Sequence, residues 1–337
     1  MPHSIHVPIS LSMRGNKTIT KNDFFGLKSL LLGMLNDYDA YAKEVRADFI
    51  EDSNILFIRD NGYGMTRSDF EDKWLTLGTD SKAVNGNSYK PQEGNRNILG
   101  EKGIGRLSIA TVGPSVLVVT RAERNGEISK IVSSYICWTL FEIPGISIDK
   151  IPIPVIETDE MPGTDDVKKL IDEVIQFYKK LKNETEDNDE KKYKISNELN
   201  EKIEKSLSIK PFSPKDLSHQ YINTESKNDG ENSILNLDSN LHGTHFYITP
   251  VDEMLSISLS KEKFSKKEIS DLQKQLLGFY PVFLEEIKCE MRTSFNIYRK
   301  DEFFPQNILG TYEFFSPTEY KKADHHFEGA FDENGTF

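Results

Sequence analysis

The stretch DNGYGM, residues 60–65, places one carboxylate, Asp60, ahead of two glycines, Gly62 and Gly64. A carboxylate in this setting can accept a hydrogen bond from an amine of a ligand, and the glycines let a planar group approach the backbone closely. A tight turn after a strand would use the same residues. The hexapeptide by itself therefore indicates either a ligand site or an ordinary turn.

A second glycine-rich stretch, GEKGIGRLS at residues 100–108, opens a predicted helix. Free backbone amides at a helix N-terminus can cradle phosphate oxygens, with support from the helix dipole. Gly100 and Gly105 have the separation of a P-loop, but Arg106-Leu107 stand where that motif needs Lys-Ser/Thr. Ser108 stands where the dinucleotide fingerprint needs its last glycine. The stretch is thus compatible with phosphate binding but matches neither motif.

A third stretch, LLLGMLNDYDA at residues 30–40, belongs to an amphipathic helix predicted from about residue 22 to residue 43. Asn36 and Asp39 lie about one turn apart in the middle of this helix. A helix that only packs on a core has little use for such residues. Both are therefore candidates for contact with a ligand.

Periodicity predicts the elements that must position these stretches. Apolar and alternating runs indicate strands, and 3.6-residue periods indicate helices. The predicted strands are 4–10, 44–52, 54–60, 115–123, 128–143 and 241–250, and the predicted helices are 22–43, 69–77, 105–113, 164–181, one ending near 207, and 265–280. This order predicts an α/β two-layer sandwich, a mixed sheet with helices on one face.

Composition restricts the class of protein. The 337 residues allow two domains, or one large domain with insertions. A net charge of −12 argues against sequence-independent DNA binding by the whole surface. Two cysteines, an N-terminus without an apolar leader and the lack of any run of roughly 18 apolar residues predict a cytoplasmic protein without a membrane span.

Taken together and in order, the three stretches resemble the motifs of the Bergerat-fold (GHKL) ATPases, the superfamily of gyrase, MutL, heat-shock chaperones, histidine kinases and MORC ATPases. Gly243-Thr244 before a late strand resembles the closing Gly-Thr element of that superfamily. WLTLGTDSK, residues 74–82, looks most like the MORC and bacterial chaperone-like branch. The resemblance covers roughly residues 5–160 and 240–250.

This resemblance implies a division of the chain. An ATP-binding domain would span residues 1–252 and include a lid at 76–105 and a charged helical insertion at 164–233. Residues 253–337 would begin an α+β transducer-like domain that is incomplete in this chain. The insertion would be either a solvated elaboration or an arm that binds a partner.

The resemblance also implies a role for each site residue. Asn36 would coordinate Mg²⁺ at the phosphates, since this ion prefers oxygen ligands. Asp60 would bind the adenine amino group, with Thr244 supporting it through water. Near the base would lie Asp39, Ala40, Gly62, Gly64 and Met65, and at the phosphates Lys102, Gly103, Ile104, Gly105 and Arg106, with Lys82 as a looser candidate.

The position of the expected catalytic base is occupied by Leu32. In the hydrolysing branches a glutamate four residues before the motif asparagine orients the attacking water. A leucine can neither accept a proton nor hold a water, and Asp37 points about 100° away from Asn36 around the helix. The catalytic residue is therefore unknown: it comes from elsewhere in the fold, or ATP hydrolysis is slow or absent.

Two functions fit these expectations. In the first, the chain is an ATP-gated dimerisation clamp or conformational switch of a larger bacterial-type machine, in which ATP closes the lid and changes how a protein or nucleic-acid partner is held. DNA repair, chaperoning and defence all stay open. In the second, the chain is a protein kinase of the histidine-kinase type. A kinase needs no water-activating base, but the sequence shows no dimerising helix with a phosphoacceptor histidine ahead of the domain.

The identity of residue 32 generates a test. If no other residue replaces the base, the protein binds ATP but hydrolyses it hardly at all, and Leu32→Glu raises turnover by up to roughly 10²- to 10⁴-fold. Steady-state phosphate release measures this, with Leu30→Glu on the same helix as the control. Fast hydrolysis by the wild type that disappears when a carboxylate elsewhere is removed would show that the base has moved.

Overall fold

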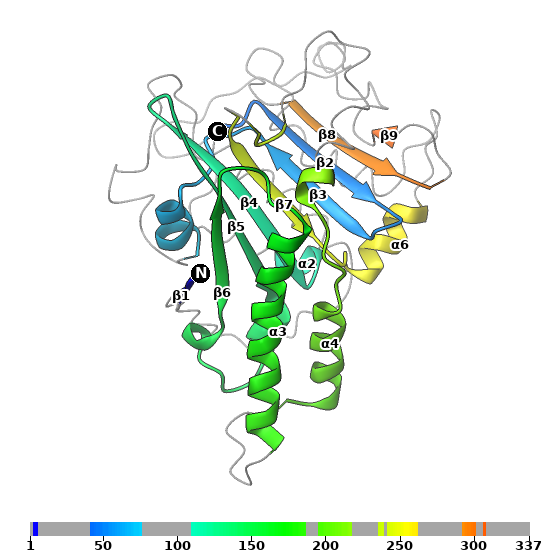
Figure 1. Ribbon diagram of the computed structural model, residues 1–337. Helices are drawn as coiled ribbons and strands as arrows, with labels where there is room; N and C mark the ends of the chain where they lie inside the picture. The colour runs from blue at the N-terminus through cyan, green and yellow to red at the C-terminus, as the bar shows by residue number, and fades with distance from the viewer. Residues whose placement is uncertain are drawn as a thin grey trace, which may run out of the picture.

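The computed structural model describes residues 3–5, 41–75, 109–186, 195–217, 235–238, 241–261, 292–300 and 306–307. The strands in this part of the chain form one mixed sheet, in the order β1-β6-β5-β4-β7-β3-β2-β8-β9 (Figure 1). Their bounds are β1 His3–Ile5, β2 Glu44–Ile50, β3 Ile55–Asp60, β4 Ser115–Arg124, β5 Glu127–Cys137, β6 Ile153–Thr158, β7 Gly243–Ile248, β8 Arg292–Tyr298 and β9 Gln306–Asn307.

Strands β2 and β3 form the predicted hairpin. They pair antiparallel, with Val45 opposite Asp60 and Ile50 opposite Ile55. The preceding helix, predicted to reach residue 43, cannot extend that far, because Tyr41 has φ 62°, in the left-handed region. The rest of that helix, residues 22–40, lies outside the described residues.

Strand β7 lies between β3 and β4 and is antiparallel to both. Its Thr244 pairs with Asp60 on one side and with Thr120 on the other. These three residues come from distant parts of the sequence, and the sheet register alone brings them into one row. Strand β5 ends at Cys137, six residues earlier than predicted, because Trp138–Glu142 form a 3-10 helix, η4.

The helices are η1 (Asp69–Trp74), α2 (Ile109–Val112), α3 (Thr164–Glu186), α4 (Asn197–Leu207) and α6 (Glu253–Lys261), with a short 3-10 turn, η5, at Ile148–Lys150. The sequence predicts η1, α2, α3 and the end of α4. It does not predict α6, and the predicted helix 265–280 lies outside the described residues.

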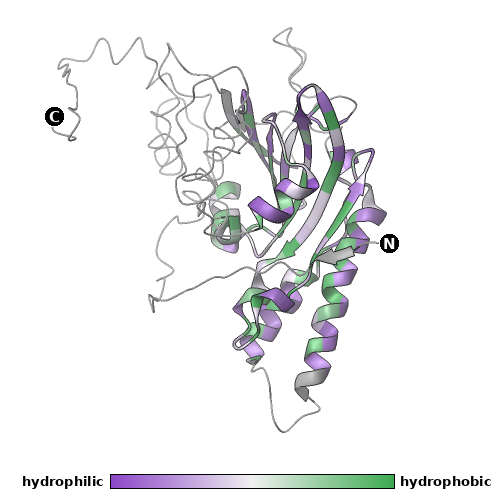
Figure 2. Cartoon of the chain, turned by 90° about the vertical axis from the view of Figure 1, so that its left-hand side faces the viewer, coloured by the Kyte–Doolittle hydropathy of each residue, from purple (hydrophilic) through white to green (hydrophobic). Residues whose placement is uncertain are grey.

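The prediction of helices on one face of the sheet is corrected by the packing. Neighbouring strand residues alternate between two buried clusters: Leu56 and Ile58 belong to the first, Ile55 and Phe57 to the second. The first cluster takes in residues of η1, α2 and α6, and the second takes in α3 and α4. In Figure 2 the long helix α3 stands beside the sheet, with both hydrophobic and hydrophilic residues along it.

The predicted insertion at 164–233 therefore includes part of the core. Its apolar stripe, read from the sequence as helical, is buried against the sheet: Val167, Leu170, Ile171, Val174, Tyr178 and Leu181. A sheet with apolar residues on both faces needs a cover on both, because exposed apolar area costs about 25 cal/mol per Å². The boundaries 164 and 233 stay a prediction.

The described parts of residues 253–337 join the same sheet. Helix α6 buries Leu255 and Leu259 in the first cluster, and β8 pairs parallel with β2, Glu44 facing Arg292 and Ile50 facing Tyr298. The described residues of this part show no second domain. The division at residue 252 stays a prediction.

Candidate nucleotide-binding site

The site is built around Asp60, the last residue of β3, which is buried between β2 and β7. Its Oδ1 accepts a hydrogen bond from the Gly62 N–H at 2.7 Å. Burial raises the pKa of this carboxyl from 3.8 to about 7, although backbone hydrogen bonds from Gly62 and Thr244 lower it in part. A carboxylate has about four acceptor positions, so these two bonds leave capacity for a donor on a ligand.

Two glycines allow the backbone to close around Asp60. Gly64 has φ 59°, and a Cβ there would lie 1.9 Å from the Arg121 carbonyl oxygen. Gly243 has φ 141°, and its Cβ would lie 2.0 Å from the Asp60 carbonyl oxygen. A side chain at Gly64 would push the loop away from β4, and one at Gly243 would push β7 away from β3, so the sequence needs glycine at both positions.

Thr120, in the middle of β4, ties three pieces of the site together. Its Oγ1 accepts from the Met65 N–H at 2.9 Å and lies 3.0 Å from both the Gly243 carbonyl oxygen and Thr244 Oγ1. A hydroxyl has one proton to donate. If Thr120 donates it to Gly243, Thr244 must donate to Thr120, which fixes the orientation of the Thr244 hydroxyl.

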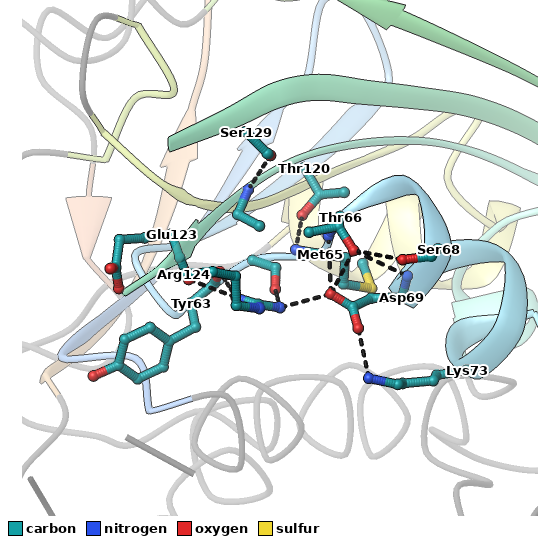
Figure 3. A network of polar contacts seen from close by, with 12 residues as sticks. Tyr63, Met65, Thr66, Ser68, Asp69, Lys73, Thr120, Glu123, Arg124 and Ser129 are labelled. Carbon is teal, nitrogen blue, oxygen red and sulfur yellow. Dashed lines mark hydrogen bonds and ion pairs between the residues drawn. The ribbon is translucent and has the colours of Figure 1, made fainter. Parts of the chain in front are cut away.

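Arg124, at the end of β4, holds the loop that follows Asp60 (Figure 3). Its guanidinium donates to the Tyr63 carbonyl at 2.8 Å and the Gly64 carbonyl at 2.9 Å, and it pairs with Asp69 Oδ2 at 2.8 Å. One planar group thus binds both the loop and the start of η1. Lysine could not reproduce this, because its ammonium lacks the rigid fork of the guanidinium.

Asp69 completes this arrangement from η1. It accepts from Lys73 Nζ at 2.6 Å and from the Thr66 hydroxyl at 2.7 Å. Burial would raise the pKa of Asp69, but the hydrogen bonds from Lys73 and Thr66 and the charge of Arg124 outweigh it and lower the pKa to about 2. Asp69 is therefore ionised at neutral pH, whereas Asp60, with its pKa near 7, is partly protonated at that pH.

Two more contacts fix the loop on its other side. The Asn61 Oδ1 accepts from the backbone N–H groups of Lys43 and Glu44 at 2.9 and 2.8 Å. The His242 Nδ1 lies 2.7 Å from the Gly62 carbonyl oxygen. The loop is thus held to the segment that enters β2 and to the segment that enters β7.

The structure places five of the residues predicted for the site. Asp60, Gly62, Gly64, Met65 and Thr244 come together at one end of β3, β4 and β7. The others lie outside the described residues: Leu32, Asn36, Asp39, Ala40, Lys82, Lys102, Gly103, Ile104, Gly105 and Arg106. Their roles stay predictions.

Sequence reasoning missed Thr120, Asp69 and Arg124. Thr120 lies in a segment predicted as an ordinary strand, and Arg124 directly follows that segment. Asp69 opens a helix, where an acidic residue is common. The one available signal was Thr120, a polar residue after the apolar run SVLVV.

A comparison with protein families matches residues 31–138 to the model of the histidine kinase-, DNA gyrase B- and HSP90-like ATPases. This part of the chain is a GHKL ATPase domain. The match spans the three stretches that carry the resemblance, from the first helix through the phosphate-loop candidate, and it resolves no branch of the superfamily. The predicted likeness to MORC proteins is therefore untested. No curated protein matches the chain.

Membership of the GHKL family implies ATP binding, and the sheet is consistent with the Bergerat α/β sandwich. Among the residues that the structure describes, no three His, Cys, Asp or Glu side chains gather into a metal site. Within the same residues, no helix has the length and hydrophobicity to cross a membrane.

Arg124 gives a direct test of the loop. Arg124→Lys keeps the charge but loses the bond to at least one loop carbonyl, so the amides of Met65 and Thr66 should exchange hydrogen faster and ATP should bind roughly tenfold or more weakly. Hydrogen exchange and calorimetry measure these effects. The control is Arg67→Lys, because Arg67 pairs with Glu71 and Glu157 and not with the loop. Unchanged exchange in residues 61–66 would show that Arg124 does not hold the loop.

Asp60 generates a pH prediction for the nucleotide-free protein. Between pH 4 and about 7 the folded protein keeps the Asp60 proton and the unfolded chain releases it, because the folded pKa is about 7 and the ordinary value is 3.8. Unfolding then releases a proton, so the free energy of unfolding falls as the pH rises, by at most about 1.4 kcal/mol per pH unit. Urea unfolding of wild type and Asp60→Asn at pH 5, 6, 7 and 8 tests this. The variant should lack that decrease, and parallel pH profiles would mean that Asp60 ionises normally.

Proposed function

We propose that this GHKL domain binds Mg-ATP, with the adenine amino group on Asp60, and acts as an ATP-gated dimerisation clamp or conformational switch in a larger bacterial-type machine. The observation that carries the proposal is the buried Asp60 carboxylate. It lies beside Gly64 and Gly243, where another backbone segment comes so close that only glycine fits. A buried carboxylate with spare acceptor capacity is a specific partner for an exocyclic amine.

The phosphate half of the proposed site rests on the sequence. Lys102 and the amides of Gly103, Ile104, Gly105 and Arg106 would hold the phosphates, Lys82 would approach from the lid, and Asn36 would coordinate Mg²⁺. Asp39 and Ala40 would form the wall near the base. The family match covers all of these positions, which supports their assignment to one site.

The connection between the site and the later part of the chain supports the clamp hypothesis. Strand β7, which carries Thr244, leads directly into α6, and α6 packs in the same core cluster as α2. Strand β8 extends the sheet beside β2. A shift of the site would therefore be transmitted through paired strands and packed helices to α6 and β8.

Because Leu32 cannot act as the base, we expect ATP hydrolysis to be slow or absent. The same observation favours the second candidate, a kinase of the histidine-kinase type, because phosphoryl transfer to a protein needs no base for water. A phosphorylated partner recovered with radiolabelled ATP would favour the kinase. ATP-dependent dimerisation without labelling of any protein would favour the clamp.

Asp60→Asn tests the assignment of the adenine. Replacing the charged acceptor by an amide should weaken ATP binding by about 1.5–3 kcal/mol, or roughly tenfold to a hundredfold. Isothermal calorimetry with a non-hydrolysable ATP analogue and Mg²⁺ measures the change. Asp52→Asn, the same substitution in the exposed β2–β3 turn, is the matched control. Equal affinities for wild type and Asp60→Asn would rule out the adenine contact.

A further inference from the structure

A cavity of about 710 Å³ lies at the opposite end of the sheet from Asp60. It is bounded by the starts of β3 and β4, by the end of β7, and by α2, η4, α4 and α6. Its wall includes Asn54, which directly precedes β3, whereas Asp60 is the last residue of that strand. At about 3.3 Å per strand residue, the two positions are roughly 20 Å apart. The cavity is therefore separate from the place assigned to adenine.

Backbone hydrogen bonds fix the segments of this wall to one another. The Asp252 N–H, at the start of α6, donates to the Val112 carbonyl of α2 at 2.7 Å. The Trp138 N–H, at the start of η4, donates to the Pro114 carbonyl at 2.8 Å. Three segments far apart in the sequence thus meet around the cavity. A wall that is already in place binds a ligand at a lower entropic cost.

The inner part of the described wall is apolar and aromatic. Both tryptophans of the chain, Trp74 and Trp138, line the cavity and are partly buried. Phe141 also lines it and lies beside Trp138, with ring centroids 5.9 Å apart. The buried aliphatic members of the wall are Leu75, Ile136, Ile153 and Val251. A ligand that fills this space therefore meets mainly rings and aliphatic side chains.

The charged residues of the described wall are all exposed and form its rim. Three are carboxylates, Glu142, Asp252 and Glu253, and two are lysines, Lys202 and Lys205. Glu142 and Lys202 pair with each other at 2.6 Å. Exposed charges are screened by water and salt, so they contribute little to binding. A charge moved from water into the apolar interior without a partner has a large free-energy cost. The wall therefore favours an uncharged ligand over an ion of either sign.

We propose that this cavity binds a small, uncharged organic molecule with an apolar ring system, in contact with Trp74 and Trp138. A cavity of several hundred Å³ with mainly apolar walls has the size and character of a small-molecule site. Indole side chains offer a large apolar surface on which a planar ring packs well. Binding there requires no nucleotide, because none of the described wall residues belongs to the proposed ATP site.

Three probes built on one body test the ligand class in the full chain without nucleotide. N-phenyl-1-naphthylamine is uncharged, 8-anilino-1-naphthalenesulfonate adds an anion, and the corresponding trimethylammonium derivative adds a cation. The uncharged probe should quench the tryptophan emission in a saturable manner, because both tryptophans of the chain line the cavity. Each charged probe should bind at least about fivefold more weakly. Equal or tighter binding of either charged probe overturns the assignment of an uncharged ligand.

Substitutions in the wall locate the uncharged probe. Trp74→Phe and Trp138→Phe each leave one indole, and both variants should still show saturable quenching. On α6, Ile257 lines the cavity and is 41% exposed, whereas Met254 is 74% exposed and lies outside the described wall. Ile257→Glu should weaken the uncharged probe at least about fivefold, and Met254→Glu should leave it unchanged. Equal loss in these two variants, or no saturable quenching in the wild type, overturns the site.

Competition with nucleotide separates this cavity from the proposed ATP site. A saturating non-hydrolysable ATP analogue with Mg²⁺ should leave the uncharged probe bound, and Asp60→Asn should bind the probe as the wild type does. Displacement by the analogue, or loss of the probe in Asp60→Asn, would place the probe in the nucleotide site and overturn the separate site. An analogue that fails to bind the wild type would count against the proposed function alone, and the comparison with Asp60→Asn would still decide the separate site.

Discussion

The pairing of β7 with both β3 and β4 is the constraint on which the rest of the site depends. It sets Thr244 between Asp60 and Thr120, and it brings Gly243 so close to the Asp60 carbonyl that no side chain fits. A one-residue slip of β7 would turn Thr244 to the opposite face of the sheet and place His245 opposite Asp60. The register of β7 therefore builds the site.

That register carries an electrostatic cost. Asp60 is buried and has no ion pair among the residues that the structure describes, and its raised pKa expresses the free energy of holding a charge there. A few residues away, Asp69 is held by Lys73, Thr66 and Arg124 and has a lowered pKa. Asp69 serves to hold the loop in place. Asp60 can accept a hydrogen bond from a ligand that supplies a donor.

A second buried charge network secures the opposite face of the same sheet. Asp48 on β2 accepts from Arg46, Arg59 and Asn296, and all four side chains are buried. Burial alone would raise the pKa of Asp48, but the charges of Arg59 and Arg46 and the bond from Asn296 lower it. Because Asn296 belongs to β8 and Asp48 to β2, the network helps to attach the later part of the chain to the strand next to the one that carries Asp60. Losing Asp48 would leave the buried guanidinium groups of Arg46 and Arg59 without this carboxylate, which is strongly destabilising.

The motifs, the β2–β3 hairpin, the apolar stripe of α3 and the resemblance to the GHKL ATPases can be predicted from local sequence, because they depend on the types and spacing of neighbouring residues. DNGYGM and Gly243-Thr244 could be assigned to one site only through their resemblance to known ATPases, since about 180 residues separate them. Only the folded chain reveals that α3 and α4 cover the second face, that β8 joins the sheet, and that Thr120 and Arg124 hold the loop. Each of these depends on contacts between segments far apart in the chain. Local periodicity shows that a face is apolar or that a strand ends in a polar residue, but it carries no information on which distant segment will pack there.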